Sequence, residues 1–160
     1  YDHVGVANEI TGATWLVQQG DYDAAFAEPV TVPAVQPELL TNLPYAERMI
    51  LTGDHDVFGD GRVRIVSAPG HTPGHMVFLL DSEGKKGAII GDAIHSKVQI
   101  EQPSWCAGVD TDKSASERSR RELINRAVTG GYVIAAGHFH PDEHFGTIRK
   151  ENDSHYWHVV

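Results

Sequence analysis

The chain has 160 residues, a formal net charge of -9 and 41% hydrophobic residues, which fits one globular domain over residues 1–160. The acidic charge argues against nucleic acid as a partner, because such surfaces need clustered lysine and arginine. No apolar run approaches the roughly 20 residues of a membrane span, so we expect no membrane partner and a cytoplasmic location. Cys106 is the single cysteine, which excludes a disulfide framework, and ten histidines are the compositional anomaly.

The first third of the chain predicts short elements around a proline-rich loop. Residues 14–17 are apolar and β-branched and predict a buried strand, and residues 21–27 predict a short helix. Prolines punctuate residues 30–45, which we expect to form a loop of the kind that often lines a pocket. Gly59-Asp60-Gly61 predicts a hairpin turn into a strand over residues 62–66, where the side chains alternate.

The central stretch is Ser67-Ala-Pro-Gly-His-Thr-Pro-Gly-His-Met76, in which His71 and His75 lie in a loop punctuated by glycine and proline. These two residue types force a defined turn, which fixes a side chain at the end of a strand. A strand is predicted over residues 76–80, then a polar turn over residues 81–86. A further strand over residues 87–90 precedes Gly91-Asp92.

The last part of the chain predicts one long helix between strands. Residues 96–112 are irregular and contain Trp105, and Ser114-Ala-Ser-Glu117 is a capping-box pattern that predicts a helix start. Leu123, Ile124, Ala127 and Val128 form an apolar stripe on this helix, and Gly130-Gly131 predicts its end. A strand is expected over residues 132–136, and a last β-pair within residues 146–160. The alternation indicates an α/β (α+β) fold.

Polar side chains follow the predicted strands in several places. His75, Asp92 and His138 lie at strand ends, and Asp2-His3 near the N-terminus is a further candidate pair. Neutral imidazole and carboxylate are the usual zinc ligands of catalytic sites. A carboxylate such as Asp92 can bridge two metals, which together would generate a hydroxide and polarise the bond it attacks.

Together these motifs resemble the metallo-β-lactamase superfamily, whose opening signature is His-x-His-x-Asp-His. Residues 1–5 (Tyr-Asp-His-Val-Gly) match the end of that signature, and Gly70-His-Thr-Pro-Gly-His75 matches the second motif. Gly91-Asp92 matches the bridging aspartate, and Ala136-Gly-His138 matches the last histidine. The motifs come in the family's order. Their flanking residues are similar to the lactonase and methyl parathion hydrolase branch.

The resemblance implies an αββα sandwich that lacks part of its first β-layer, because the family's first two histidines would precede Tyr1. We therefore expect the chain to be the C-terminal part of a larger hydrolase. Asp2, His3 and His138 would hold one metal with Asp92, and His75 would hold the other with the same carboxylate. Zinc is the first expectation, as one or two ions, with iron or manganese as alternatives.

The function that the resemblance implies is hydrolysis by a metal-bound hydroxide, with Asp92 as the central catalytic residue. A lactone or ester is the first substrate class, followed by an organophosphate triester and a thioester. Two rivals stay open, namely a non-catalytic binding or assembly domain with a partial metal site and an oxygenase with a single iron. We expect a small-molecule substrate and a homo-oligomer, because a missing β-layer would expose an apolar sheet face.

Several assignments keep an alternative. His140 or His144 could replace His138 as the ligand. His71 is expected to orient the loop through a hydrogen bond rather than to bind metal. His95 is either a residue that lines the pocket or a partner of a ligand. Trp105 either shapes the substrate pocket or is an ordinary buried aromatic residue.

Overall fold

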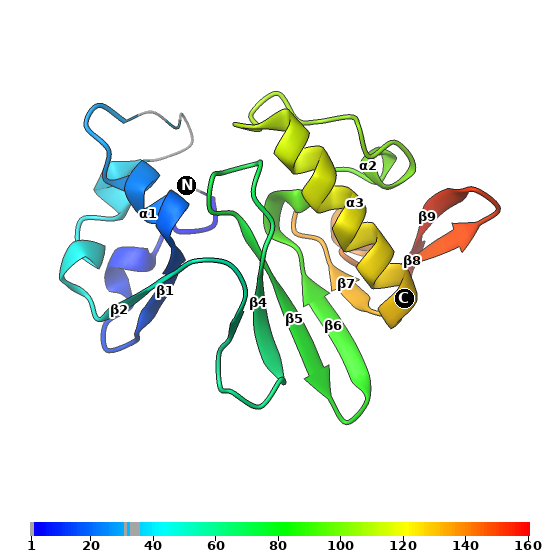
Figure 1. The fold of residues 1–160 in the computed structure, drawn as a ribbon, viewed down its shortest axis with the longest axis horizontal. Helices are drawn as coiled ribbons and strands as arrows, with labels where there is room; N and C mark the ends of the chain where they lie inside the picture. Colours follow the sequence, from blue (N-terminus) through cyan, green and yellow to red (C-terminus); the bar gives the residue numbers. More distant parts are fainter. Residues whose placement is uncertain (1, 31, 33–35) are drawn as a thin grey trace.

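The computed structural model describes residues 2–30, 32 and 36–160, and shows a mixed α/β fold with two sheets (Figure 1). Tyr1 and the part of the expected 30–45 loop at residues 31 and 33–35 lie outside the described residues. The expectation of an α/β fold class is confirmed. In the described part of the chain, no helix combines the length and the apolar character that crossing a membrane requires.

The larger sheet has seven strands in sequence order, from β3 to β9. All neighbouring pairs are antiparallel except β6 and β7, which run parallel. The strands are β3 (His55–Asp56), β4 (Val63–Ser67), β5 (Met76–Ser82), β6 (Lys85–Ile89), β7 (Val133–Ala135), β8 (Phe145–Glu151) and β9 (Ser154–Val159). The β8–β9 hairpin extends away from the rest of the molecule (Figure 1).

A smaller unit precedes this sheet and lies beside β4 in Figure 1. It consists of the parallel pair β1 (Trp15–Gln18) and β2 (Arg48–Leu51) with helix α1 (Gln19–Ala25). Its buried residues Ala25, Leu40 and Leu43 form a separate small core against Trp15 and Phe26. Short 3-10 helices complete the unit at η1 (Ala7–Glu9), η2 (Pro37–Leu39) and η3 (Leu43–Tyr45).

Helix α3 (Lys113–Gly130) is the connection between the parallel strands β6 and β7 and covers one face of the larger sheet (Figure 1). Its residues Leu123, Ile124 and Ala127 pack in the main core. The sheet contributes alternate side chains to this core, as period-two alternation requires, among them Val77, Leu79, Ala88 and Ile134. Between β6 and α3 lie the short elements η4 (Gly91–Ala93) and α2 (Val98–Glu101), and η5 (Pro141–Glu143) precedes β8.

The predicted strands and the long helix are confirmed, but two local predictions are wrong. Asp112 rather than Ser114 caps α3, because the Asp112 carboxylate accepts a hydrogen bond from the Ala115 N–H at 2.9 Å. The expected polar turn over residues 81–86 is only two residues long. Glu83 and Gly84 both have positive φ angles, the conformation of a tight hairpin turn, so β5 and β6 extend further toward it.

The second face of the larger sheet is less covered. Phe78 of β5 and Ile89 of β6 are paired residues on this face, and Ile89 is 48% exposed. Val133 of β7 lies on the same side and is 41% exposed. This face therefore leaves apolar side chains partly open to solvent.

Candidate metal centre

The candidate site lies where several connections meet at one edge of the larger sheet. Because β6 and β7 are parallel, the loops that follow them leave the sheet at the same edge, and the antiparallel strand β5 begins there. The 68–75 loop, η4 and residues 137–140 therefore converge. The N-terminal turn at Asp2 and His3 reaches the same place, which we infer from the contacts of both side chains described next.

Asp92 is the centre of the cluster, and its carboxylate oxygens face different histidines. His138 Nε2 lies 2.6 Å from Asp92 Oδ1, and His3 Nε2 lies 3.0 Å from the same oxygen. The two histidine nitrogens are 3.3 Å apart. Asp2 Oδ2 lies 3.7 Å from His138 Nε2 and 3.8 Å from His3 Nε2. The four expected residues Asp2, His3, Asp92 and His138 are thus brought together.

On the other side of the same carboxylate, His71 Nε2 lies 3.1 Å from Asp92 Oδ2. The second ring nitrogen of His71, Nδ1, lies 3.0 Å from Asp110 Oδ1. The His71 ring is buried, so both of its nitrogens are held by carboxylates away from bulk water. His71 therefore does more than orient the loop: its ring faces the oxygen of Asp92 that His3 and His138 leave open.

His75, which we expected to bind metal, is placed differently. Its Nδ1–H donates to the Ala68 carbonyl at 3.1 Å, and its Nε2 accepts a hydrogen bond from the Asp92 backbone N–H at 3.0 Å. Both ring nitrogens are thus engaged by the backbone and neither faces the cluster. A Cβ on Gly91 would lie 2.9 Å from His75 Nε2, so glycine permits this close approach.

His95 lies beside the cluster. Its Nε2 is 3.8 Å from Asp92 Oδ1, and its ring is 5.0 Å from the rings of both His71 and His138. His140 instead has its Nδ1 3.7 Å from Asp142 and is mostly exposed. Of these loop histidines, the structure therefore brings His138 rather than His140 to Asp92.

A cavity of about 410 Å³ opens at the cluster and continues onto the apolar sheet face. Trp105 is not among its lining residues and is 60% exposed, so the structure places Trp105 neither in this pocket nor in the core. A second cavity of about 210 Å³ shares Asp21 and Thr72 with the first. The 30–45 loop contributes Val32, Gln36 and Leu40 to this second cavity.

The pKa shifts follow from burial and from the shared charge of Asp92. Burial lowers the pKa of His75 to about 4, so its imidazole is neutral near neutral pH. The hydrogen bond to Asp92 raises the pKa of His71, although burial opposes the shift. Burial acts to raise the pKa of the Asp92 carboxyl. The hydrogen bond from His71 and the charges of His3 and His138 outweigh it and hold that pKa well below its ordinary value.

Sequence reasoning missed three residues that support the site. Asp110 faces His71 from a position 39 residues away. Asp21 accepts hydrogen bonds from the Gly74 N–H at 2.7 Å and from the Thr72 hydroxyl at 3.0 Å. Arg120 is fully buried beside Asp110. A charged residue on the apolar side of a predicted amphipathic helix was the available signal for Arg120.

The chemistry of these donors fits a divalent metal. The groups Asp2–His3–His138 and Asp92–His95–His138 each hold donor atoms within 4.8 Å of one another, as does His71–His95–Asp110. Imidazole nitrogens and carboxylate oxygens suit zinc and related ions. The imidazole nitrogens of His3 and His138 lie only 3.3 Å apart beside one oxygen of Asp92. So many ligand atoms this close together are unusual unless a metal ion lies among them. The fold and these donor atoms define an α/β protein with a candidate metal centre at the edge of the larger sheet where the strands end.

Comparison with known proteins identifies the family. The model of the metallo-beta-lactamase superfamily matches residues 1–142, and the chain belongs to this superfamily. An N-acyl homoserine lactonase of a Bacillus species is 31% identical over 127 residues, covering 78% of this chain and 47% of the relative. The N-acyl homoserine lactonase AttM of Agrobacterium fabrum is 28% identical over 141 residues, covering 82% of this chain and 54% of the relative. The resemblance to the lactonase branch is thus confirmed.

Solved structures show the same fold. The hydrolase AbOPH superposes with a TM-score of 0.71 at 23% identity, over 92% of this chain and 55% of that chain. AidC, a dizinc quorum-quenching lactonase, superposes with a TM-score of 0.71 at 20% identity, over 91% of this chain and 54% of that one. The expected metallo-β-lactamase fold is therefore confirmed. The chain spans about half the length of the curated relatives it matches.

Proposed function

We propose that this chain acts as a metal-dependent hydrolase whose substrate is a lactone or an ester. The observation that carries the proposal is the position of Asp92 between two sets of histidines. One oxygen faces His3 and His138, and the other faces His71. A carboxylate with this arrangement is suited to hold two metal ions side by side. The curated N-acyl homoserine lactonases among the relatives favour the lactone over other substrates.

Two ligand sets are proposed from this geometry. His3 and His138, together with Asp2 and Asp92 Oδ1, would hold one ion. His71 and Asp92 Oδ2 would contribute to the second position, where we had expected His75. His71 replaces His75 in the proposal because backbone groups already occupy both nitrogens of the His75 ring.

The bound metals would supply an acidified water and an electrophile for the carbonyl oxygen of the substrate. The protein residues do the rest by position. His75 holds the backbone of Asp92, so the carboxylate enters the cluster from a fixed direction. The cavity beside the cluster carries Met76, Phe78 and Ile89, which would bind the apolar part of a small substrate next to the reacting bond.

Metal analysis combined with hydrolysis assays tests the proposal. We expect about one firmly bound zinc per chain, at the His3–His138 position. The second position has only His71 and Asp92, and two protein ligands rarely hold zinc firmly. His138→Ala should abolish this binding, whereas the exposed His140→Ala should not. Lactone opening should be lost with a strong chelator. Zinc binding that survives His138→Ala would overturn the proposed ligand set.

A panel of four substrates distinguishes the possible substrate classes from one another and from a non-catalytic role. A lactone, an aryl ester, a phosphotriester and a thioester should be assayed side by side with the metal-loaded chain. Faster turnover of the phosphotriester or the thioester would move the substrate class within the superfamily. Firm metal binding without turnover of any of the four would favour a non-catalytic binding or assembly role.

A further inference from the structure

Arg120, in the middle of α3, is fully buried and has no part in the ligand sets described above. Its guanidinium donates to the carbonyls of Ala93 at 2.9 Å and Pro103 at 2.6 Å, and to the Ser116 hydroxyl at 3.1 Å. Its charge partner is Asp110, whose side chain is also fully buried and lies 3.6 Å away. Burial of such a pair costs several kcal/mol per ion in desolvation, so stability alone is a weak reason for it.

Asp110 divides its two oxygens between the helix and the metal centre. Oδ2 accepts from the Ser116 hydroxyl at 2.8 Å and from the Ala107 N–H at 3.1 Å, in addition to the nearby guanidinium. Oδ1 is left for His71 Nδ1 at 3.0 Å. A carboxylate only accepts hydrogen bonds, so the contact with Asp110 requires a proton on His71 Nδ1. The other nitrogen, Nε2, faces a second carboxylate oxygen, Asp92 Oδ2, at 3.1 Å, and its proton is the one that a metal ion would replace.

The same guanidinium also reaches the other partner of His71. Ala93 follows Asp92 directly in η4, and its carbonyl accepts from Arg120 Nε. Arg120 is thus linked to Asp92 through one residue of backbone and to His71 through Asp110. The His71 ring and the Asp92 carboxylate would share the second metal position. The rigid, planar guanidinium of Arg120 connects the two.

The 68–75 loop is fixed against the same part of α3. The Gly70 carbonyl accepts from the Asp112 N–H at 2.9 Å, and the Ser119 hydroxyl donates to the Pro69 carbonyl at 2.7 Å. A Cβ on Gly70 would lie 2.1 Å from the backbone nitrogen of Ser116, so the loop and the helix approach as closely as glycine allows. His71 therefore cannot shift relative to Asp110 without moving the start of α3.

From these contacts we propose that Arg120 and Asp110 form a positioning pair for the metal centre. Asp110 holds a proton on Nδ1 of His71 and so orients the ring, and Arg120 fixes the spacing between His71 and Asp92. The metal-related part of this inference rests on the proposed function, in which His71 Nε2 and Asp92 bind a divalent metal. Carboxylate partners of this type orient imidazole ligands and raise their basicity.

Asp110→Asn tests the first half of the pair. An asparagine must turn its NH₂ group either to His71 or to the donors of Ser116 and Ala107. With NH₂ toward His71, Nδ1 becomes the acceptor and the ring carries its proton on Nε2. Nitrogen-15 NMR of the metal-free chain should show a proton on Nδ1 of His71 in the wild type. The variant should lose this proton from Nδ1 and should bind the second, weaker equivalent of zinc about 10–100-fold more weakly than the wild type does.

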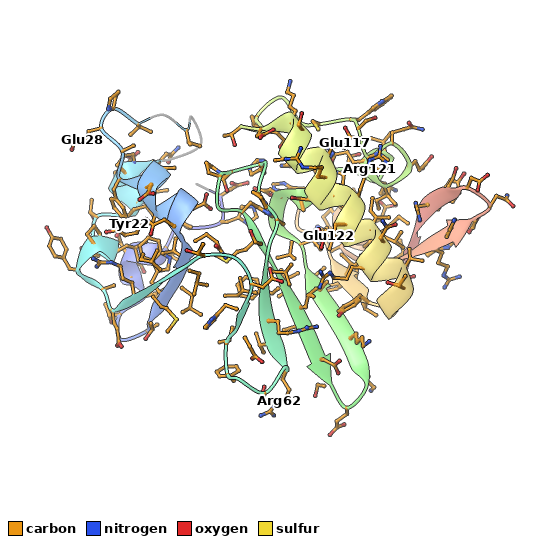
Figure 2. The ribbon with its side chains drawn as sticks, in the orientation of Figure 1. Tyr22, Glu28, Arg62, Glu117, Arg121 and Glu122 are labelled. Atoms are coloured by element: carbon orange, nitrogen blue, oxygen red, sulfur yellow. The ribbon has the colours of Figure 1, made fainter. Side chains whose placement is uncertain are left out.

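Arg120→Lys tests the second half, because lysine keeps the charge but loses the fork that reaches Ala93. We expect this variant to retain the proton on His71 Nδ1, since Asp110 remains, while its affinity for the second equivalent of zinc falls. Arg121→Lys is the matched control. Arg121 pairs with Glu117 on the exposed side of α3, where Figure 2 labels both side chains. This exchange should leave the tautomer and the zinc affinity unchanged.

Asp112→Ala distinguishes the positioning role of Asp110 and Arg120 from a purely structural role. This variant removes the N-cap of α3 and costs about 1 kcal/mol of stability. This variant should lower the melting temperature without changing the His71 tautomer or the zinc affinity. The proposal is overturned if Asp110→Asn keeps the proton on His71 Nδ1 with unchanged affinity for the second equivalent of zinc. It is also overturned if Asp112→Ala alters both in the same way as Asp110→Asn.

Failure of the proposed function gives a different result. A wild-type chain that binds no zinc would remove the metal centre and, with it, the metal-positioning role of the pair. The tautomer comparison needs no metal, so it decides separately whether Asp110 sets the state of the His71 ring.

Discussion

At Asp92, one carboxylate is held from three directions by histidine nitrogens. His3 and His138 approach Oδ1, and His71 approaches Oδ2. The backbone N–H of the same residue is held by His75. Because both the carboxylate and its backbone are fixed, a metal ion would meet an oriented ligand and would not have to immobilise it.

Asp92→Asn should therefore remove metal from the site. An amide has one oxygen in place of two and carries no charge, so it cannot serve both histidine sets. We expect zinc affinity to fall by more than the roughly 10–100-fold that loss of an outer partner costs. Equilibrium dialysis against a weak chelator, followed by metal analysis, measures this. Asp142→Asn, an exposed carboxylate in η5, is the control, and equal zinc retention by both variants would remove Asp92 from the site.

At the scale of single residues, the sequence pointed to some residues of the cluster but not to how each histidine ring is used. Asp92 and His138 were found because each follows a strand directly, and both reach the cluster. His71 and His75 lie in one loop only four residues apart, and their roles depend on the course of the backbone through Gly70 and Gly91. Asp110 could not be assigned, because it lies 39 residues from His71, with β5, β6 and α2 between them.

At the scale of elements, the 68–75 loop is clamped between two helices. Helix α3 holds its first half at Pro69 and Gly70. Helix α1 holds its second half, where the Asp21 carboxylate accepts from the Gly74 N–H and the Thr72 hydroxyl. The small N-terminal unit therefore takes part in fixing the ligand loop of the larger sheet.

Asp21→Ala should loosen this clamp. The Gly74 N–H and the partly buried Thr72 hydroxyl lose their acceptor, which costs about 1–3 kcal/mol in the free energy of unfolding. Asp23→Ala on the same helix is the control, because Asp23 accepts only from exposed Gln19 among the side-chain contacts described for it, and such changes stay within about 0.5 kcal/mol. Urea unfolding of both variants measures the difference. Equal loss of stability in the two variants would contradict the clamp.

The same carboxylate gives a pH dependence of defined sign. Burial raises the pKa of Asp21 above its ordinary value of 3.8, and the hydrogen bonds from Gly74 and Thr72 only partly offset this. A raised pKa in the folded state contributes stability at low pH that is lost as the pH rises through it. The free energy of unfolding of the wild type, relative to Asp21→Asn, should therefore fall as the pH increases from about 3.8. A relative stability that rises over this range would show that the carboxylate prefers its charged form.

The element boundaries show what local patterns can decide. The apolar stripe and Gly131 placed α3, alternation placed β4, and an apolar run placed β5. The cap of α3 was misplaced because Asp112 and Ser114 are both good capping residues, and contacts with Gly70 select the first. The clamp by α1 was invisible to local reading, because Asp21 and Gly74 are 53 residues apart.

At the scale of the whole molecule, the larger sheet is covered unequally. Helix α3 buries Val77, Leu79 and Ala88 completely, whereas the opposite face leaves Ile89 48% exposed beside Phe78. The sequence predicted this imbalance only through the family resemblance. No alternation pattern tells which face of a strand will find a covering layer, because that layer is distant in sequence or in another chain.

We expect the chain to self-associate through this face at micromolar concentration. Each Å² of apolar surface removed from water contributes about 25 cal/mol, and a second copy offers an equivalent apolar face. Ile89→Lys should shift the chain toward the monomer in sedimentation equilibrium, because burial of a charge is costly. Val109→Lys, at a 66% exposed residue before α3, should leave association unchanged. A clean wild-type monomer that binds no apolar dye would refute the association.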